Sequence, residues 1–107
     1  MDYRFDHENL DVYRLALEVY RAIAAWPAPR GWASLHDQAV RASSSAVLNI
    51  AEGRARGGPA GRNHYRIAHG SAAETCSALD MLPIPTAAAL QQKERRVGAM
   101  LSKMSRP

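Results

Sequence analysis

Four arginines, Arg54, Arg56, Arg62 and Arg66, form the group of side chains whose types and spacing best suit a binding role. They surround a glycine-rich stretch between two predicted helices, so the end of one helix and the start of the next should bring them to the same end of the molecule. Guanidinium groups match the geometry of phosphate, and a helix N-terminus adds free N–H donors and a favourable dipole. The sequence therefore predicts a basic end that holds a nucleic-acid backbone, RNA or DNA, without reading its base sequence.

The same arginines also have a purely structural explanation. Arg62 and Arg66 would pair with Glu52 or neighbouring carboxylates, and Arg54 and Arg56 would be solvated, as basic helix faces commonly are. The glycine-rich run superficially suggests a phosphate-binding loop, yet it follows a predicted helix rather than a strand and lacks the G-K-[ST] ending of a Walker loop. Nucleotide hydrolysis is therefore not expected.

The other polar side chains do not have the spacing of a metal or catalytic site. His64 and His69 are five residues apart, so on a helix they point about 140° away from each other. Ser43, Ser44 and Ser45 lie inside a predicted helix with no G-x-S-x-G elbow or preceding strand, and their small size favours close helix packing. We expect no catalytic residue, no metal and no cofactor, and therefore no enzyme.

Composition indicates a small helical domain with an uneven charge. The chain has 107 residues, of which 47% are apolar, and its many alanines favour helices packed closely together. Residues 1–53 carry five basic and seven acidic side chains, whereas residues 54–107 carry nine basic and three acidic ones, which is compatible with a polyanionic partner. The single Cys76 and the lack of a membrane-spanning apolar run favour a cytoplasmic protein without membrane contact.

Apolar periodicity predicts four helices joined by short connections. We expect them over residues 10–26, 34–52, 62–82 and, after a cap at Thr86, up to residue 104. Such a pattern gives an all-α fold, an antiparallel up-and-down four-helix bundle. The bundle should occupy residues 10–104, with an N-terminal arm over residues 1–9 and a frayed tail over residues 105–107.

Proline, glycine and capping residues set the expected helix ends. Pro27 and Pro83 stop the first and third helices, because proline lacks an N–H and disfavours the helical conformation before it. Gly53 is expected to end the second helix in the left-handed conformation, and a mobile basic loop should follow. Asn9 and Thr86 are the expected N-caps of the first and fourth helices.

The first helix carries two apolar stripes that together cover well over half of its circumference. Such a helix calls for a second apolar neighbour, which favours a homo-oligomer; the alternative is a central position in a monomeric bundle. Gly70, inside the third helix, suggests that another helix approaches closely there. His36 and Cys76 are expected to be packed, and Glu94 is expected on the exposed face of the fourth helix.

Several motifs occur in a fixed order: NIAEG at residues 49–53, Arg56-Gly57, and then Arg66-Ile67-Ala68 with Gly70-Ser71. Together with Leu10-Asp11-Val12-Tyr13 near the start, they resemble bacterial four-helix-bundle proteins first noticed in intervening sequences of large-subunit ribosomal RNA genes. The similarity covers residues 5–82. Each motif alone is weak, but the ordered combination is specific.

The resemblance implies an antiparallel four-helix bundle, often assembled as a homopentamer, and kinship with the accessory variability protein of diversity-generating retroelements. That relative is a basic pentameric barrel that binds nucleic acid and its reverse transcriptase. We therefore expect a non-enzymatic oligomer, a pentamer, that binds RNA or DNA through its basic end. The alternative is a protein–protein interaction module with no nucleic-acid role.

Overall fold

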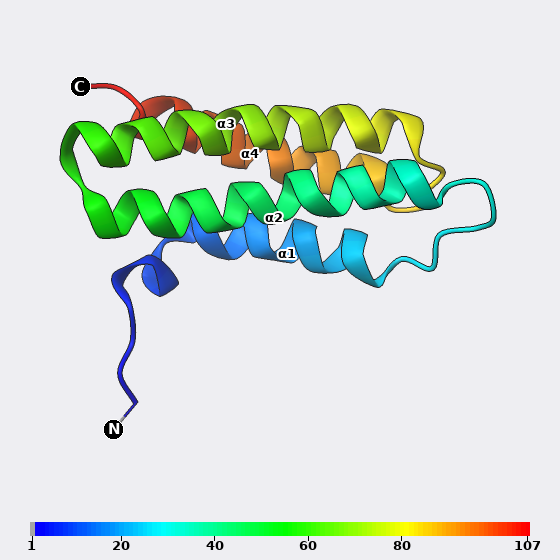
Figure 1. The fold of residues 1–107 in the computed structure, drawn as a ribbon, viewed down its shortest axis with the longest axis horizontal. Helices are drawn as coiled ribbons and strands as arrows, with labels where there is room; N and C mark the ends of the chain where they lie inside the picture. The colour runs from blue at the N-terminus through cyan, green and yellow to red at the C-terminus, as the bar shows by residue number, and fades with distance from the viewer. Residues whose placement is uncertain (1) are drawn as a thin grey trace.

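A computed structural model describes residues 2–107, and no β-strand occurs among them. The elements are the 3₁₀ turn η1 (Asp6–Asn9) and the helices α1 (Asp11–Ala25), α2 (Ala33–Arg56), α3 (Gly58–Met81) and α4 (Ala87–Met104). The helices run in alternating directions, and the α2–α3 turn lies at the same end as both termini (Figure 1). The predicted all-α bundle of four helices is confirmed.

Each helix packs against two others around the bundle. α2 contacts α1 and α3, and α4 contacts α3 and α1, so α1 and α2 form one side and α3 and α4 the opposite side. Two clusters make the core. The cluster nearer the termini is Val12, Ala16, Val47, Ile50, Ala68, Ala72, Val97 and Leu101. The cluster at the other end is Val19, Ile23, Ala39, Ala78, Leu79, Leu82, Ile84 and Leu90.

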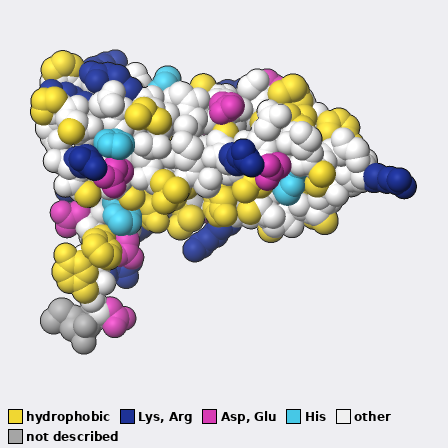
Figure 2. All heavy atoms as spheres, in the orientation of Figure 1, with side chains coloured by type: hydrophobic (Ala, Val, Ile, Leu, Met, Phe, Trp, Pro, Cys, Tyr) yellow, Lys and Arg dark blue, Asp and Glu magenta, His cyan; other side chains and the backbone are white. Residues whose placement is uncertain are grey.

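The two apolar stripes of α1 have different environments. Val12, Ala16, Val19 and Ile23 are fully buried. In the second stripe, Leu10, Tyr13, Leu17 and Tyr20 are half-buried against the first core cluster. Figure 2 shows further hydrophobic side chains at the surface, on the arm and along the middle of the face in view. Part of the second stripe is therefore covered within the chain itself.

The prediction that Gly53 ends the second helix is wrong. α2 continues to Arg56, and the left-handed residues are Gly57 (φ 65°) and Gly58 (φ 57°). The expected mobile loop over residues 54–61 is reduced to Gly57 between two helices. Gly53 is instead buried against α3, because a Cβ there would stand 2.6 Å from Cε1 of Tyr65. Close packing, rather than backbone freedom, explains this glycine.

Helix ends follow the prolines more closely than the predicted caps. α1 ends at Ala25 and α3 ends at Met81, as the prolines predicted. Asn9 lies inside η1, and the N-cap of α1 is Leu10, whose side chain makes no capping bond, so the Asn9 prediction is wrong. Thr86 is the N-cap of α4, as expected, but its side chain makes no capping hydrogen bond.

Four further expectations have mixed outcomes. His36 is packed, with its Nε2 2.7 Å from the Ile23 carbonyl oxygen and its ring edge-to-face with Trp26. The close approach expected at Gly70 is absent within the described chain, because a Cβ there would meet nothing within 4 Å. Cys76 is only half-buried. Glu94, expected at the surface, is buried with 2% of its area exposed.

Candidate functional site

The four predicted arginines lie at the end of the bundle that holds the α2–α3 turn. Arg54 and Arg56 belong to the last turn of α2, and Arg62 and Arg66 belong to the first turns of α3. Because Gly57 alone separates the two helices, the chain reverses without a loop and both pairs stay at this end (Figure 1). The helices, rather than a flexible segment, therefore position the arginines.

Arg56 is held by its own helix. Its Nε donates to Oε1 of Glu52 over 2.6 Å, one turn earlier, and this hydrogen bond and charge lower the pKa of the Glu52 carboxyl. Both side chains are about half exposed, so the pair is a surface ion pair of small energetic value. The carboxylate nevertheless neutralises one of the four cations. Glu52 had been expected to pair with Arg62 or Arg66.

Arg66 connects the N-terminal part of α3 to the residues that follow α4. Its Nη2 donates to the Ser105 carbonyl oxygen over 3.1 Å, just after α4 ends. The hydroxyl of Ser105 donates in turn to the Leu101 carbonyl oxygen over 2.6 Å. Lys103 and Arg106 are thereby brought to the same end as the arginines. Sequence reasoning missed these two cations because about 40 residues separate them from Arg66 and only the fold brings them near.

Arg54 and Arg62 have no hydrogen bond or ion pair with any residue from 2 to 107. Arg54 is exposed and Arg62 is half-buried. Burial raises the pKa of Tyr65, and the charge of Arg54 partly opposes that rise, which places Arg54 beside the tyrosine. Of the predicted set, these two guanidinium groups are available to an external anion.

The acidic arm lies beside the basic end. A small hollow is lined by Arg54 and Ala55 of α2 and by Tyr3, Phe5 and Asp6 of the arm, together with His7. The arm is held to α1 by the Arg14 guanidinium, whose Nε donates to the Glu8 carbonyl oxygen over 3.1 Å. The Asp6 carboxylate and the Arg54 guanidinium therefore line the same hollow.

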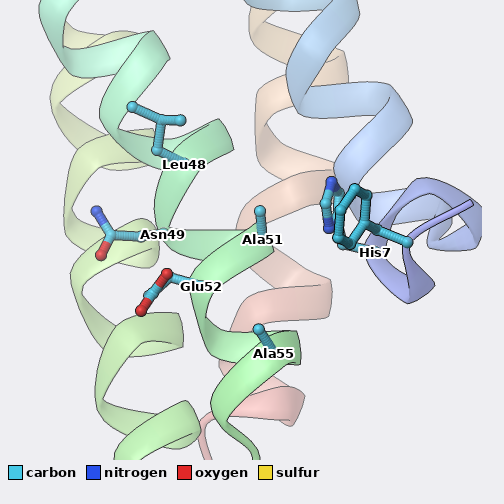
Figure 3. A pocket seen from close by; sticks show the side chains of 7 residues that line it. His7, Leu48, Asn49, Ala51, Glu52 and Ala55 are labelled. Atoms are coloured by element: carbon cyan, nitrogen blue, oxygen red, sulfur yellow. The ribbon is translucent and has the colours of Figure 1, made fainter.

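A second hollow separates the arm from α2. Its lining residues are Phe5, His7, Leu48, Asn49, Ala51, Glu52 and Ala55, around a volume of about 430 Å³. Figure 3 shows Ala51 and Ala55 on the side of α2 that faces His7. Leu48 is 68% exposed at its edge. The walls are mainly apolar, and His7 and Glu52 are the titratable groups on them, which is not a catalytic arrangement.

A series of polar contacts connects α2 and α3 on the side of the arginines that is farther from the α2–α3 turn. The Nδ1 of His64 lies 2.9 Å from Oδ1 of Asn49, and the hydroxyls of Ser45 and Ser71 lie 2.9 Å apart. Asn49 also donates to the Ser45 carbonyl oxygen over 2.9 Å. Asn49, Gly53 and Ser71 are motif residues, so the motifs serve helix packing at this junction.

A groove of about 460 Å³ runs between α3 and α4 on the opposite side of the bundle from the arm. Its lining residues are His69, Ala72, Ala73, Cys76, Glu94, Arg95, Gly98, Ala99 and Ser102. Burial raises the pKa of Glu94 to about 7, and Oε1 of this residue has no hydrogen-bond partner among the described residues. Burial also raises the pKa of the Cys76 thiol.

Residues 2–107 contain no group of three or more His, Cys, Asp or Glu side chains that could hold a metal ion. None of the helices they form combines the length and the apolar character that crossing a bilayer requires.

Comparison of the sequence with curated proteins finds no match. A family model described as 23S rRNA-intervening sequence protein matches residues 8–103, which include α1, α2 and α3 and all of α4 except its last residue. The match also includes the α2–α3 junction, with its motif residues Asn49, Gly53 and Ser71, and the arginines around it. The chain therefore belongs to the 23S rRNA-intervening sequence protein family.

Proposed function

We propose that this protein is a non-enzymatic, cytoplasmic homo-oligomer, a pentamer, that binds the backbone of RNA or DNA through its basic end. The observation that carries the binding role is the pair Arg54 and Arg62, two guanidinium groups without partners among residues 2–107 on either side of the α2–α3 turn. Lys103 and Arg106 add charge nearby. Phosphate is the anion that such an array of cations on rigid helix ends would bind, without base readout.

Charge distribution supports this proposal. The second half of the chain carries nine basic and three acidic residues, and the fold brings the start of α3 and the end of α4 to one end. Arg56 and Arg66 already bond to Glu52 and to the Ser105 carbonyl oxygen. Arg66, whose partner is an uncharged carbonyl group, adds positive potential, while Arg54 and Arg62 make direct contacts.

A salt titration tests the binding role. Fluorescence anisotropy with a labelled RNA of mixed sequence, repeated at several salt concentrations, should give an affinity that falls steeply with salt, and a DNA of the same sequence should behave similarly. Changing Arg54 and Arg62 to alanine together should reduce the slope of log K against log salt by about two. Arg30→Ala, at the other end of the bundle, is the matched control. Binding that is absent or independent of salt would refute the proposal.

The oligomer has its own support. It is implied by the resemblance, and Leu48 and Met81 remain 68% and 54% exposed in the single chain. Sedimentation of the purified protein tests it, and a monomer at micromolar concentration would contradict it.

The exposed Leu48 and Met81 side chains also favour a second candidate function, a module that engages another protein. Recovery of one discrete protein partner after nuclease treatment, with no salt-dependent RNA binding, would support that candidate instead.

A further inference from the structure

The groove between α3 and α4 contains an unsatisfied buried carboxyl group. Glu94 is 2% exposed, and its Oε1 has no hydrogen-bond partner among the described residues. Buried polar atoms without partners are rare in proteins because desolvation is costly. An unpaired, buried carboxyl oxygen in the wall of a groove indicates that a donor entering the groove from outside the chain completes the site.

The walls of this groove are shaped to admit a segment from outside. Ala72, Ala73 and Ala99 are small, and a Cβ at Gly98 would meet nothing within 4 Å. The groove therefore remains open along α4 instead of being filled by the side chains of its own helices. Its occupant should combine apolar groups for the alanine walls with a cationic donor for Glu94.

The N-terminal arm has this combination. Tyr3 and Phe5 are 82% and 59% exposed, and they flank Arg4 in a segment that projects from the bundle (Figure 1). The only ion pair of Arg4 with the described residues is to Glu8, at 3.8 Å and in solvent, which is a weak interaction. The last part of the arm, η1, packs on α1 and α2, across the bundle from the groove. A second copy can therefore bring the two surfaces together.

We propose that the arm of one copy of this chain docks in the α3–α4 groove of the next copy, where the Arg4 guanidinium donates to the Glu94 carboxylate. Tyr3 and Phe5 cover the alanine walls. A guanidinium supplies two donors and a neutralising charge at once, which an unpaired buried carboxylate requires. Because the two surfaces lie on opposite sides of the chain, the contact is head-to-tail. This inference rests on the oligomer in the proposed function and identifies its interface.

Filling the groove is the first test. Gly98→Leu adds a side chain to an open position on the surface of α4 and should convert the oligomer to monomer in sedimentation velocity. Gly70→Leu is the matched control, because a Cβ at Gly70 also meets nothing within 4 Å and Gly70 does not line the groove. The control should sediment as the wild type does, and circular dichroism checks that both variants are folded. An oligomer that persists with Gly98→Leu overturns the inference while leaving the oligomer itself intact.

A double-mutant cycle tests the proposed pair. Arg4→Gln and Glu94→Gln should each weaken self-association by about tenfold or more. The double variant should be no weaker than either single variant, because each change removes the same interaction. If the double variant weakens the self-association constant by the product of the two single effects, Arg4 and Glu94 do not form a pair. A wild-type protein that sediments as a monomer would overturn both this inference and the oligomer, whereas the salt-dependent RNA titration separately decides the role of the arginines.

Discussion

Gly53 of α2 and Gly61 of α3 are in close backbone contact beside the α2–α3 turn. A Cβ on Gly61 would stand 2.5 Å from the carbonyl oxygen of Gly53, a distance that requires the helix backbones to move apart. Both residues are buried. The contact fixes the angle at which the two helices meet and so fixes the positions of the arginines on either side of Gly57.

Gly61→Ala should therefore destabilise the protein. The added methyl group overpacks a backbone contact, which typically costs about 1–3 kcal/mol. Gly70→Ala is the control, because its Cβ would meet nothing within 4 Å and the change should stabilise α3 by about 0.5–1 kcal/mol. Urea denaturation measures both free energies of unfolding. Equal stability of the two variants would contradict the close approach of Gly61 to Gly53.

These two glycines also show the limit of what the sequence predicts. Four helices, their proline stops and the packed His36 follow from local patterns, because periodicity and proline chemistry act within one helix. Gly53 was misread as a helix end because a glycine required for helix contact and one required for a left-handed turn look alike in sequence. Only the position of Tyr65 and Gly61 distinguishes the two roles.

The candidate site was predictable to a similar extent. Helix order is enough to place Arg54, Arg56, Arg62 and Arg66 at one end. Their partners are not predictable, because the bond from Arg66 to Ser105 depends on how α4 returns along α3. Glu94 was assigned to the exposed face because it sits in a run of polar residues. The fold turns it toward α3 instead.

Asn49 and His64 should stabilise the α2–α3 junction as a pair. Their side chains meet at 2.9 Å in a half-buried position. Asn49→Ala should cost about 1–2 kcal/mol, because His64 is left without its partner. Thermal or urea unfolding of Asn49→Ala, His64→Ala and the double variant gives the coupling energy. A coupling near zero would show that the contact contributes no stability.

The stability of the monomer should depend on pH through Glu94. Burial raises the pKa of this carboxyl from 4.5 to about 7, so the folded chain holds the proton more tightly than the unfolded chain does. The stabilisation is fully present below pH 4.5 and is lost as the pH rises through about 7. Relative to Glu94→Gln, the wild type should lose up to about 3 kcal/mol across this range.

The measurement is denaturant unfolding at several pH values, in protein dilute enough to be monomeric. His69 and Cys76 of α3 and Arg95 of α4 also line the groove. His69→Asn, which removes the imidazole that also lines the groove, is the control and should keep the pH dependence. If Glu94→Gln and the wild type show parallel pH profiles, the pKa of Glu94 is the same in the folded and unfolded chains and burial does not raise it.

Glu52 should restrain nucleic-acid binding by holding Arg56. The bond of 2.6 Å from the Arg56 Nε to Oε1 of Glu52 keeps that guanidinium neutralised beside the free Arg54. Glu52→Gln removes the carboxylate charge and should raise the affinity for a labelled RNA at low salt by about threefold, with a steeper salt dependence, because one more cation reaches phosphate.

Glu74→Gln makes the same change in net charge on α3 and is the matched control, since Glu74 has no ion pair with residues 2–107. It should alter the affinity much less than Glu52→Gln does. Adding Arg56→Ala to Glu52→Gln should abolish the gain, because the freed guanidinium is its source. Equal gains from the two glutamine variants would mean that overall charge, and not the basic end, governs binding.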